Sequence, residues 1–131
     1  MHTLDKFYIN GAWVDPIGTQ TMPIMNPATA SQIGTVTLGA AEDVDRAVEA
    51  AKQAFETFSL TSKDERLALL EKLREVTEAR LGDLAAAMTA EMGAPATMSL
   101  EVQAYSGLGH LDDFIQSLKA LDQEEVLANG D

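Results

Sequence analysis

Cysteine is absent from this sequence of 131 residues. Disulfide bonds, thiolate metal ligands and a cysteine nucleophile are therefore excluded within the chain. Basic residues are also few, 9 against 21 acidic ones, so the net charge is −12. Because a chain of this charge repels polyanions, we expect it to bind neither nucleic acid nor an anionic membrane surface.

Long apolar runs are missing as well. No stretch approaches the roughly 20 apolar residues that span a bilayer. Residues 1–6 lack the basic segment and apolar run of a secretory signal or transit peptide, so we expect a cytoplasmic protein. With 46% hydrophobic and 23% charged residues, the composition is that of a globular domain.

Recognisable catalytic motifs are absent too. His2 and His110 are the only histidines and lie far apart, so we expect no catalytic zinc site and interpret His110 as a core or rim residue. No Gly-x-Ser-x-Gly elbow places a serine nucleophile. Residues 107–112 contain two glycines of a dinucleotide-binding loop, but the third glycine and a preceding strand are missing.

Carboxylates occur as neighbours near expected helix starts or on expected polar faces, where the helix dipole accounts for them without catalysis. They are Glu42, Asp43, Asp64, Glu65, Asp112 and Asp113. The single tryptophan, Trp13, is interpreted as a packing residue. We therefore predict no catalytic, coenzyme-binding or metal-binding residues in this chain.

The first part of the chain has the pattern of short strands. Asn10-Gly11 tolerates the positive φ angles of a type I′ turn, so the residues on either side are expected to form a tight hairpin. Extended runs follow at residues 21–25 and 32–38, joined by an Asn-Pro turn at Asn26. Residues 1–38 are thus predicted to be a β-hairpin region.

From Ala41 the apolar period changes to three and four, which predicts a helix with one apolar stripe. The stripe contains Val44, Ala47, Val48, Ala51, Phe55 and Phe58. Ser62 and Glu65 form a capping box that opens a second helix, whose stripe is broad enough to meet two neighbours. Gly82 is expected to end it.

Asp83 is expected to cap a third helix, which Gly93 and Pro95 stop. A fourth helix is predicted from Ala96 to about residue 121. Gly107 and Gly109 lie inside it, so we expect a closely packed backbone or a kink there.

The residues therefore predict an α+β fold, mainly α, with short hairpins followed by about four packed helices. A helical region would occupy residues 39–121. An acidic tail at residues 122–131 is interpreted as a solvated helix end rather than a recognition tail.

Five short motifs follow one another in a fixed order. They are residues 7–14 (FYINGAWV), 24–29 (IMNPAT), 42–55 (beginning EDVDRAV), 65–70 (ERLALL) and 90–95 (AEMGAP). Together they resemble the amino-terminal part of NAD(P)-dependent aldehyde dehydrogenases. The likeness covers about residues 7–120, and Met92 and Ala94 depart from the family's usual Glu-Thr-Gly-Lys-Pro form.

The resemblance implies a parent enzyme that oxidises an aldehyde to a carboxylate with NAD or NADP. In that family a cysteine thiolate attacks the carbonyl, hydride passes to nicotinamide, and a glutamate-activated water hydrolyses the thioester. Those groups follow the part that this chain resembles. The chain would be a structural layer on the α/β dinucleotide-binding domain, with no coenzyme and no activity of its own.

In some family members, main-chain carbonyls matching Met25 and Glu91 help to hold a monovalent cation. Main-chain ligands leave no side-chain pattern, and we assign no metal residue here.

Three hypotheses remain open. The leading one is a truncated amino-terminal part of an aldehyde dehydrogenase, whose uncovered apolar stripes self-associate or pack on the rest of the enzyme. The second is a stand-alone protein-interaction module derived from that family. The third is an independent acid–base or serine enzyme that uses His110 or Asp112.

Overall fold

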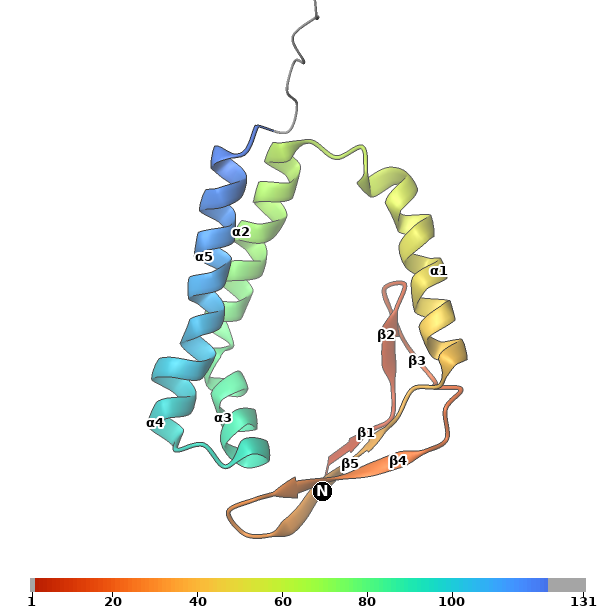
Figure 1. Ribbon diagram of the computed structural model, residues 1–131, viewed down its shortest axis with the longest axis vertical. Helices are drawn as coiled ribbons and strands as arrows, with labels where there is room; N and C mark the ends of the chain where they lie inside the picture. Colours follow the sequence, from red (N-terminus) through yellow and green to blue (C-terminus); the bar gives the residue numbers. More distant parts are fainter. Residues whose placement is uncertain (1, 123–131) are drawn as a thin grey trace, which may run out of the picture. The chain divides into compact units, whose positions relative to one another are not determined.

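The computed structural model describes residues 2–122, in which strands come first and helices follow (Figure 1). Its contacts divide the chain into two compact units. One contains Met1–Leu60 and Ala87–Pro95, and the other contains Thr61–Ala86 and Ala96–Asp131. The expected α+β fold, mainly α, is confirmed. Apart from Asp122, the predicted acidic tail lies outside the described residues.

The first unit contains the predicted hairpin. Strands β2 (Phe7–Ile9) and β3 (Ala12–Val14) pair antiparallel, with Tyr8 opposite Trp13. The turn residues have positive φ angles, 53° at Asn10 and 77° at Gly11. These are the angles that a type I′ turn requires, so the predicted turn is confirmed.

A three-stranded sheet completes the strands of this unit. Strands β4 (Thr21–Asn26) and β5 (Ser31–Thr37) pair antiparallel, and β1 (His2–Leu4) adds to β5 in parallel. The carboxamide oxygen of Asn26 accepts hydrogen bonds from the amides of Ala28 and Thr29, as expected for the Asn-Pro turn. Strand β1 was not predicted because three exposed residues give no measurable alternation.

Helix α1 (Ala41–Phe58) begins where the change of period predicted it. Helix α2 (Lys63–Ala79) begins with the predicted capping box. The amide of Glu65 donates to the Ser62 hydroxyl over 3.2 Å, and the Ser62 amide donates to the Glu65 carboxylate over 2.7 Å. The hydrogen bond from the Ser62 amide is the main reason that the pKa of Glu65 is lowered.

The boundary before the third helix differs from the prediction. Helix α3 (Leu81–Met92) begins one residue before Gly82, and Asp83 lies in its first turn. The break falls at Arg80, whose carbonyl accepts from the amides of Asp83 and Leu84. Arg80 also donates to the Asp83 carboxylate, over 3.0 Å. Helix α3 ends before Gly93, as predicted, where φ is 72°.

The predicted fourth helix is continuous but not uniform. It comprises α4 (Ala96–Met98), a π-helical segment η1 (Ser99–Ala104) and α5 (Tyr105–Ala120). A Cβ built on Gly107 or Gly109 would meet no atom within 4 Å outside its own helix, so the close packing expected there is wrong. The irregularity precedes the glycines, in η1.

The second unit has a small core on one side of this helix. Ala104, Leu108 and Ile115 are buried, and their spacing places them on one face. Helices α2 and α5 lie side by side and antiparallel (Figure 1). Among the helices of the described residues, none is both long and apolar enough to cross a membrane.

Candidate functional site

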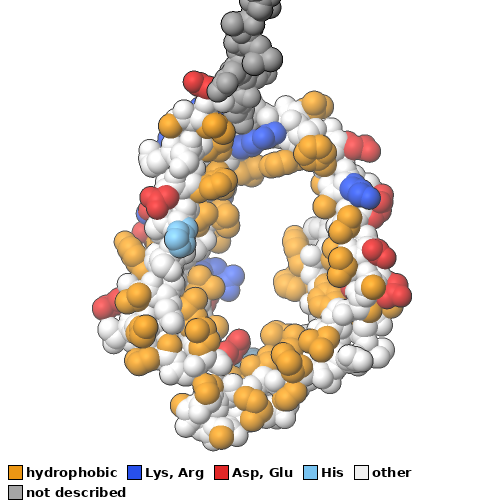
Figure 2. Space-filling view, viewed as in Figure 1, with side chains coloured by type: hydrophobic (Ala, Val, Ile, Leu, Met, Phe, Trp, Pro, Cys, Tyr) orange, Lys and Arg blue, Asp and Glu red, His pale blue; other side chains and the backbone are white. Residues whose placement is uncertain are grey.

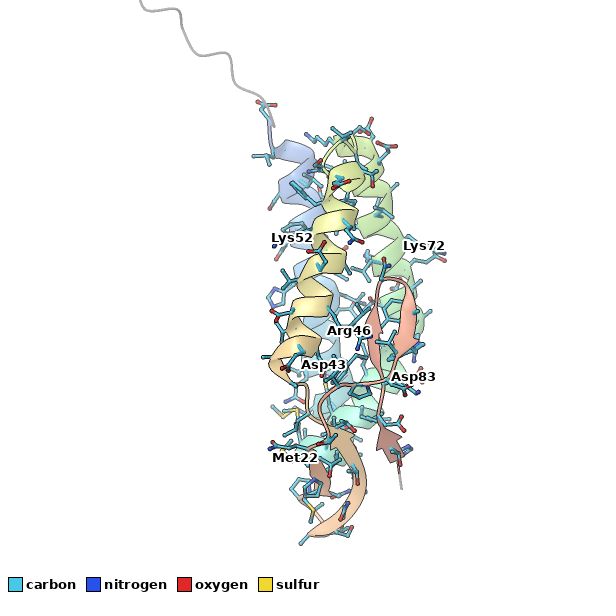
Figure 3. The ribbon with its side chains drawn as sticks, turned by 90° about the vertical axis from the view of Figure 1, so that its right-hand side faces the viewer. Met22, Asp43, Arg46, Lys52, Lys72 and Asp83 are labelled. Atoms are coloured by element: carbon cyan, nitrogen blue, oxygen red, sulfur yellow. The ribbon has the colours of Figure 1, made fainter. Side chains whose placement is uncertain are left out.

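A buried carboxylate lies at the start of α1. Asp43 is only 4% exposed and accepts hydrogen bonds from three main-chain amides. Its donors are Ile17 at 2.9 Å, Gly18 at 3.0 Å and Ala40 at 3.0 Å. Arg46, one turn further along α1 (Figure 3), lies 3.7 Å from the same carboxylate.

These hydrogen bonds, first from Ile17 and then from Ala40, hold the pKa of Asp43 below its ordinary value. They direct both carboxylate oxygens to the main chain. Asp43 therefore joins the segment at Ile17 and Gly18 to the first turn of α1. We interpret it as a structural anchor.

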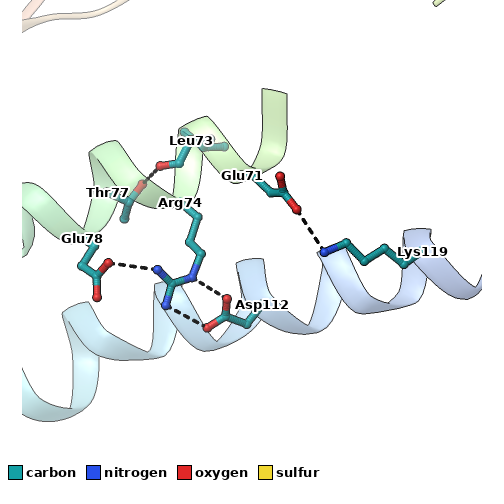
Figure 4. A network of polar contacts seen from close by, with 7 residues as sticks. All are labelled: Glu71, Leu73, Arg74, Thr77, Glu78, Asp112 and Lys119. Atoms are coloured by element: carbon teal, nitrogen blue, oxygen red, sulfur yellow. Dashed lines mark hydrogen bonds and ion pairs between the residues drawn. The ribbon is translucent and has the colours of Figure 1, made fainter. Parts of the chain in front are cut away.

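Asp112 takes part in a charge network between α2 and α5 (Figure 4). Its carboxylate accepts from Arg74 at 2.5 and 3.3 Å, and Arg74 also donates to Glu78 at 2.9 Å. The hydrogen bond from Arg74 to Asp112 is the main reason that the pKa of Arg74 is raised. A second pair, Glu71 with Lys119 at 3.0 Å, joins the same helices.

The end of α5 is held from the start of α2. Lys63 donates through Nζ to the carbonyl oxygens of Lys119 at 2.7 Å and Leu121 at 2.8 Å. These are among the carbonyls at a helix end that have no partner within the helix. The polar groups between α2 and α5 thus join the two helices along their length.

The other sequence candidates are not brought together. His2 is exposed on β1 and His110 is exposed on α5. Of the two places expected for His110, core or rim, the core is therefore excluded. Asp64 and Glu65 lie in the first turn of α2, while Asp113 is exposed on α5. Within residues 2–122, no group of three His, Cys, Asp or Glu side chains could hold a metal ion.

Trp13 contacts Tyr8, the residue opposite it in the hairpin, with the two rings tilted. The ring centroids are 5.3 Å apart with a 60° angle between the planes. Trp13 nevertheless remains 71% exposed. It packs on its neighbour, as predicted, but the pair is not covered by any other described element.

Two segments named by the resemblance do meet in the first unit. A Cβ built on Gly93 would lie 2.7 Å from Cγ of Pro27, so the turn after β4 packs against the end of α3. Met25 and Glu91, the residues that match the family's carbonyl ligands, flank this contact in sequence. The fold thus brings the two segments together around a glycine.

An open apolar groove lies between the hairpin and α1. Its volume is about 640 Å³, and it is lined mainly by Phe7, Ile9, Val44, Ala47, Val48 and Ala51. The sequence had not predicted it. The sequence does contain one indication of it. Phe7 and Ile9 lie on the same side of a strand, and such an apolar face usually packs against another element.

Large apolar side chains on the helices remain uncovered. On α1 they are Val44, Val48, Phe55 and Phe58, and on α2 they are Leu69, Leu73 and Val76. Figure 2 shows hydrophobic side chains gathered along one side of α1 and charged ones along the other. This surface is characteristic of an interface, as the sequence led us to expect.

Residues 13–131 match the aldehyde dehydrogenase family. A 3-succinoylsemialdehyde-pyridine dehydrogenase from a Pseudomonas species is 44% identical over 128 residues, which are 97% of this chain and 27% of that protein. The chain thus spans about a quarter of the length of the curated relatives it matches, at their amino-terminal end.

Solved structures agree with this match. The aldehyde dehydrogenase of Bartonella henselae has a TM-score of 0.94 at 39% identity, covering 100% of this chain and 28% of that one. A cysteine-to-alanine mutant of aldehyde dehydrogenase C from Pseudomonas syringae, in complex with NAD+ and octanal, has a TM-score of 0.91 at 33% identity. The match covers 95% of this chain and 26% of that one. From its motifs, its fold and these matches, the chain belongs to the aldehyde dehydrogenase family.

Proposed function

We propose that this chain is the amino-terminal structural layer of a cytoplasmic enzyme that oxidises an aldehyde to a carboxylate with NAD or NADP. In this proposal the catalytic and coenzyme-binding groups lie outside residues 1–131, and the chain alone is inactive. The strand region (1–38), the helical region (39–121) and the acidic tail (122–131) together form one incomplete domain. The NAD+ in the Pseudomonas syringae complex favours NAD as the coenzyme.

The main observation behind this proposal is the uncovered apolar stripe of α2. One side of α2 packs on α5 through the contacts of Lys63, Glu71 and Arg74. Leu69, Leu73 and Val76 lie at i, i+4 and i+7 and remain exposed. Since the relatives are almost four times as long, the rest of the enzyme is the natural cover for this second apolar side.

Residues 107–112 do not form the phosphate-binding loop of a dinucleotide site. Gly107 and Gly109 lie within α5, whereas a phosphate-binding loop follows a strand and precedes a helix. We therefore assign no coenzyme contact to this chain. Titration of the isolated chain with NAD+ and NADP+ should show no saturable binding, and micromolar affinity for either would contradict this assignment.

A chimera tests the proposed function. Residues 1–131 would replace the matching amino-terminal segment of the Pseudomonas relative, which shares 44% of its residues with this chain. We expect a soluble enzyme that still reduces NAD+ with the aldehyde in the relative's name. A chimera carrying a segment of unrelated sequence is the control. A soluble chimera without activity would instead favour a stand-alone interaction module.

A further inference from the structure

We draw no further inference here: the strongest candidate, the open apolar groove between the β2–β3 hairpin and α1, lies in a chain that spans about a quarter of its relatives' length, and nothing in the structure shows what covers it.

Discussion

At the scale of single residues, Asp43 is a buried carboxylate that accepts hydrogen bonds from three main-chain amides. Its carboxylate holds three main-chain amides that belong to two segments distant in sequence from each other. An asparagine of the same shape would present one acceptor oxygen and one donor group, so it could not satisfy all three amides. The charge of Asp43 therefore contributes to the stability of the first unit.

This carboxylate predicts a particular dependence of stability on pH. Because folding lowers the pKa of Asp43, its contribution is complete above the unfolded value of about 3.9 and is lost as the pH falls through the folded value. Asp43→Asn should lower the midpoint of thermal unfolding at neutral pH. As the pH is lowered, the midpoint of this variant should fall less than that of the native chain. Asp45→Asn, on the exposed side of α1, is the control. Equal curves for native chain and Asp43→Asn would contradict the assignment.

Glycines give a second prediction at this scale. Gly93 has φ of 72° and faces Pro27, so Gly93→Ala should destabilise the chain by about 1–3 kcal/mol. Gly107 lies in α5 with free space around it, and Gly107→Ala should stabilise by about 0.5–1 kcal/mol. Urea unfolding measures both. If Gly107→Ala destabilises the chain, the result would support the close packing that was expected from the sequence.

At the scale of elements, α2 and α5 form a pair fixed by polar contacts and by a narrow apolar face. Leu108 is 1% exposed and belongs to that face. Leu108→Ala should therefore cost about 2–5 kcal/mol of unfolding free energy, the range for a buried leucine. Phe114→Ala, on the exposed side of α5, should change it by about 0.5 kcal/mol or less. Similar losses in the two variants would show that the packing of α5 is misassigned.

The helices and strands also show which features of the fold local sequence patterns can predict. The hairpin, α1 and the capping box of α2 were predictable because Asn10-Gly11, a change of period and Ser62 with Glu65 each act within a few residues. The start of α3 was not predicted correctly. The sequence led us to expect that Gly82 ends α2 and that Asp83 caps α3, whereas the break between the two helices lies at Arg80. The π-helical segment η1 had no local signal, since its register depends on which side chains are buried.

At the scale of the whole molecule, the order of the motifs predicted the family. The exposed apolar surfaces, in contrast, could be located only from the structure. Periodicity showed that α1 and α2 carry apolar stripes. It could not show that Phe7 and Ile9 leave a groove beside α1, because that depends on contacts between residues more than 30 positions apart. Of the carboxylates named from sequence, Asp43 and Glu65 accept hydrogen bonds from main-chain amides, and Asp112 accepts hydrogen bonds from Arg74.

The central claim is that the α2 stripe is an internal surface of a larger enzyme, and Leu73→Glu tests it most directly. Leu73 is 50% exposed in this chain. The thermal midpoint of the isolated chain should therefore hardly change, whereas the chimera carrying Leu73→Glu should lose both thermal stability and aldehyde oxidation. Lys72→Glu, on the solvated side of α2, is the control. A Leu73→Glu chimera with the stability and activity of the unmodified chimera would contradict the account.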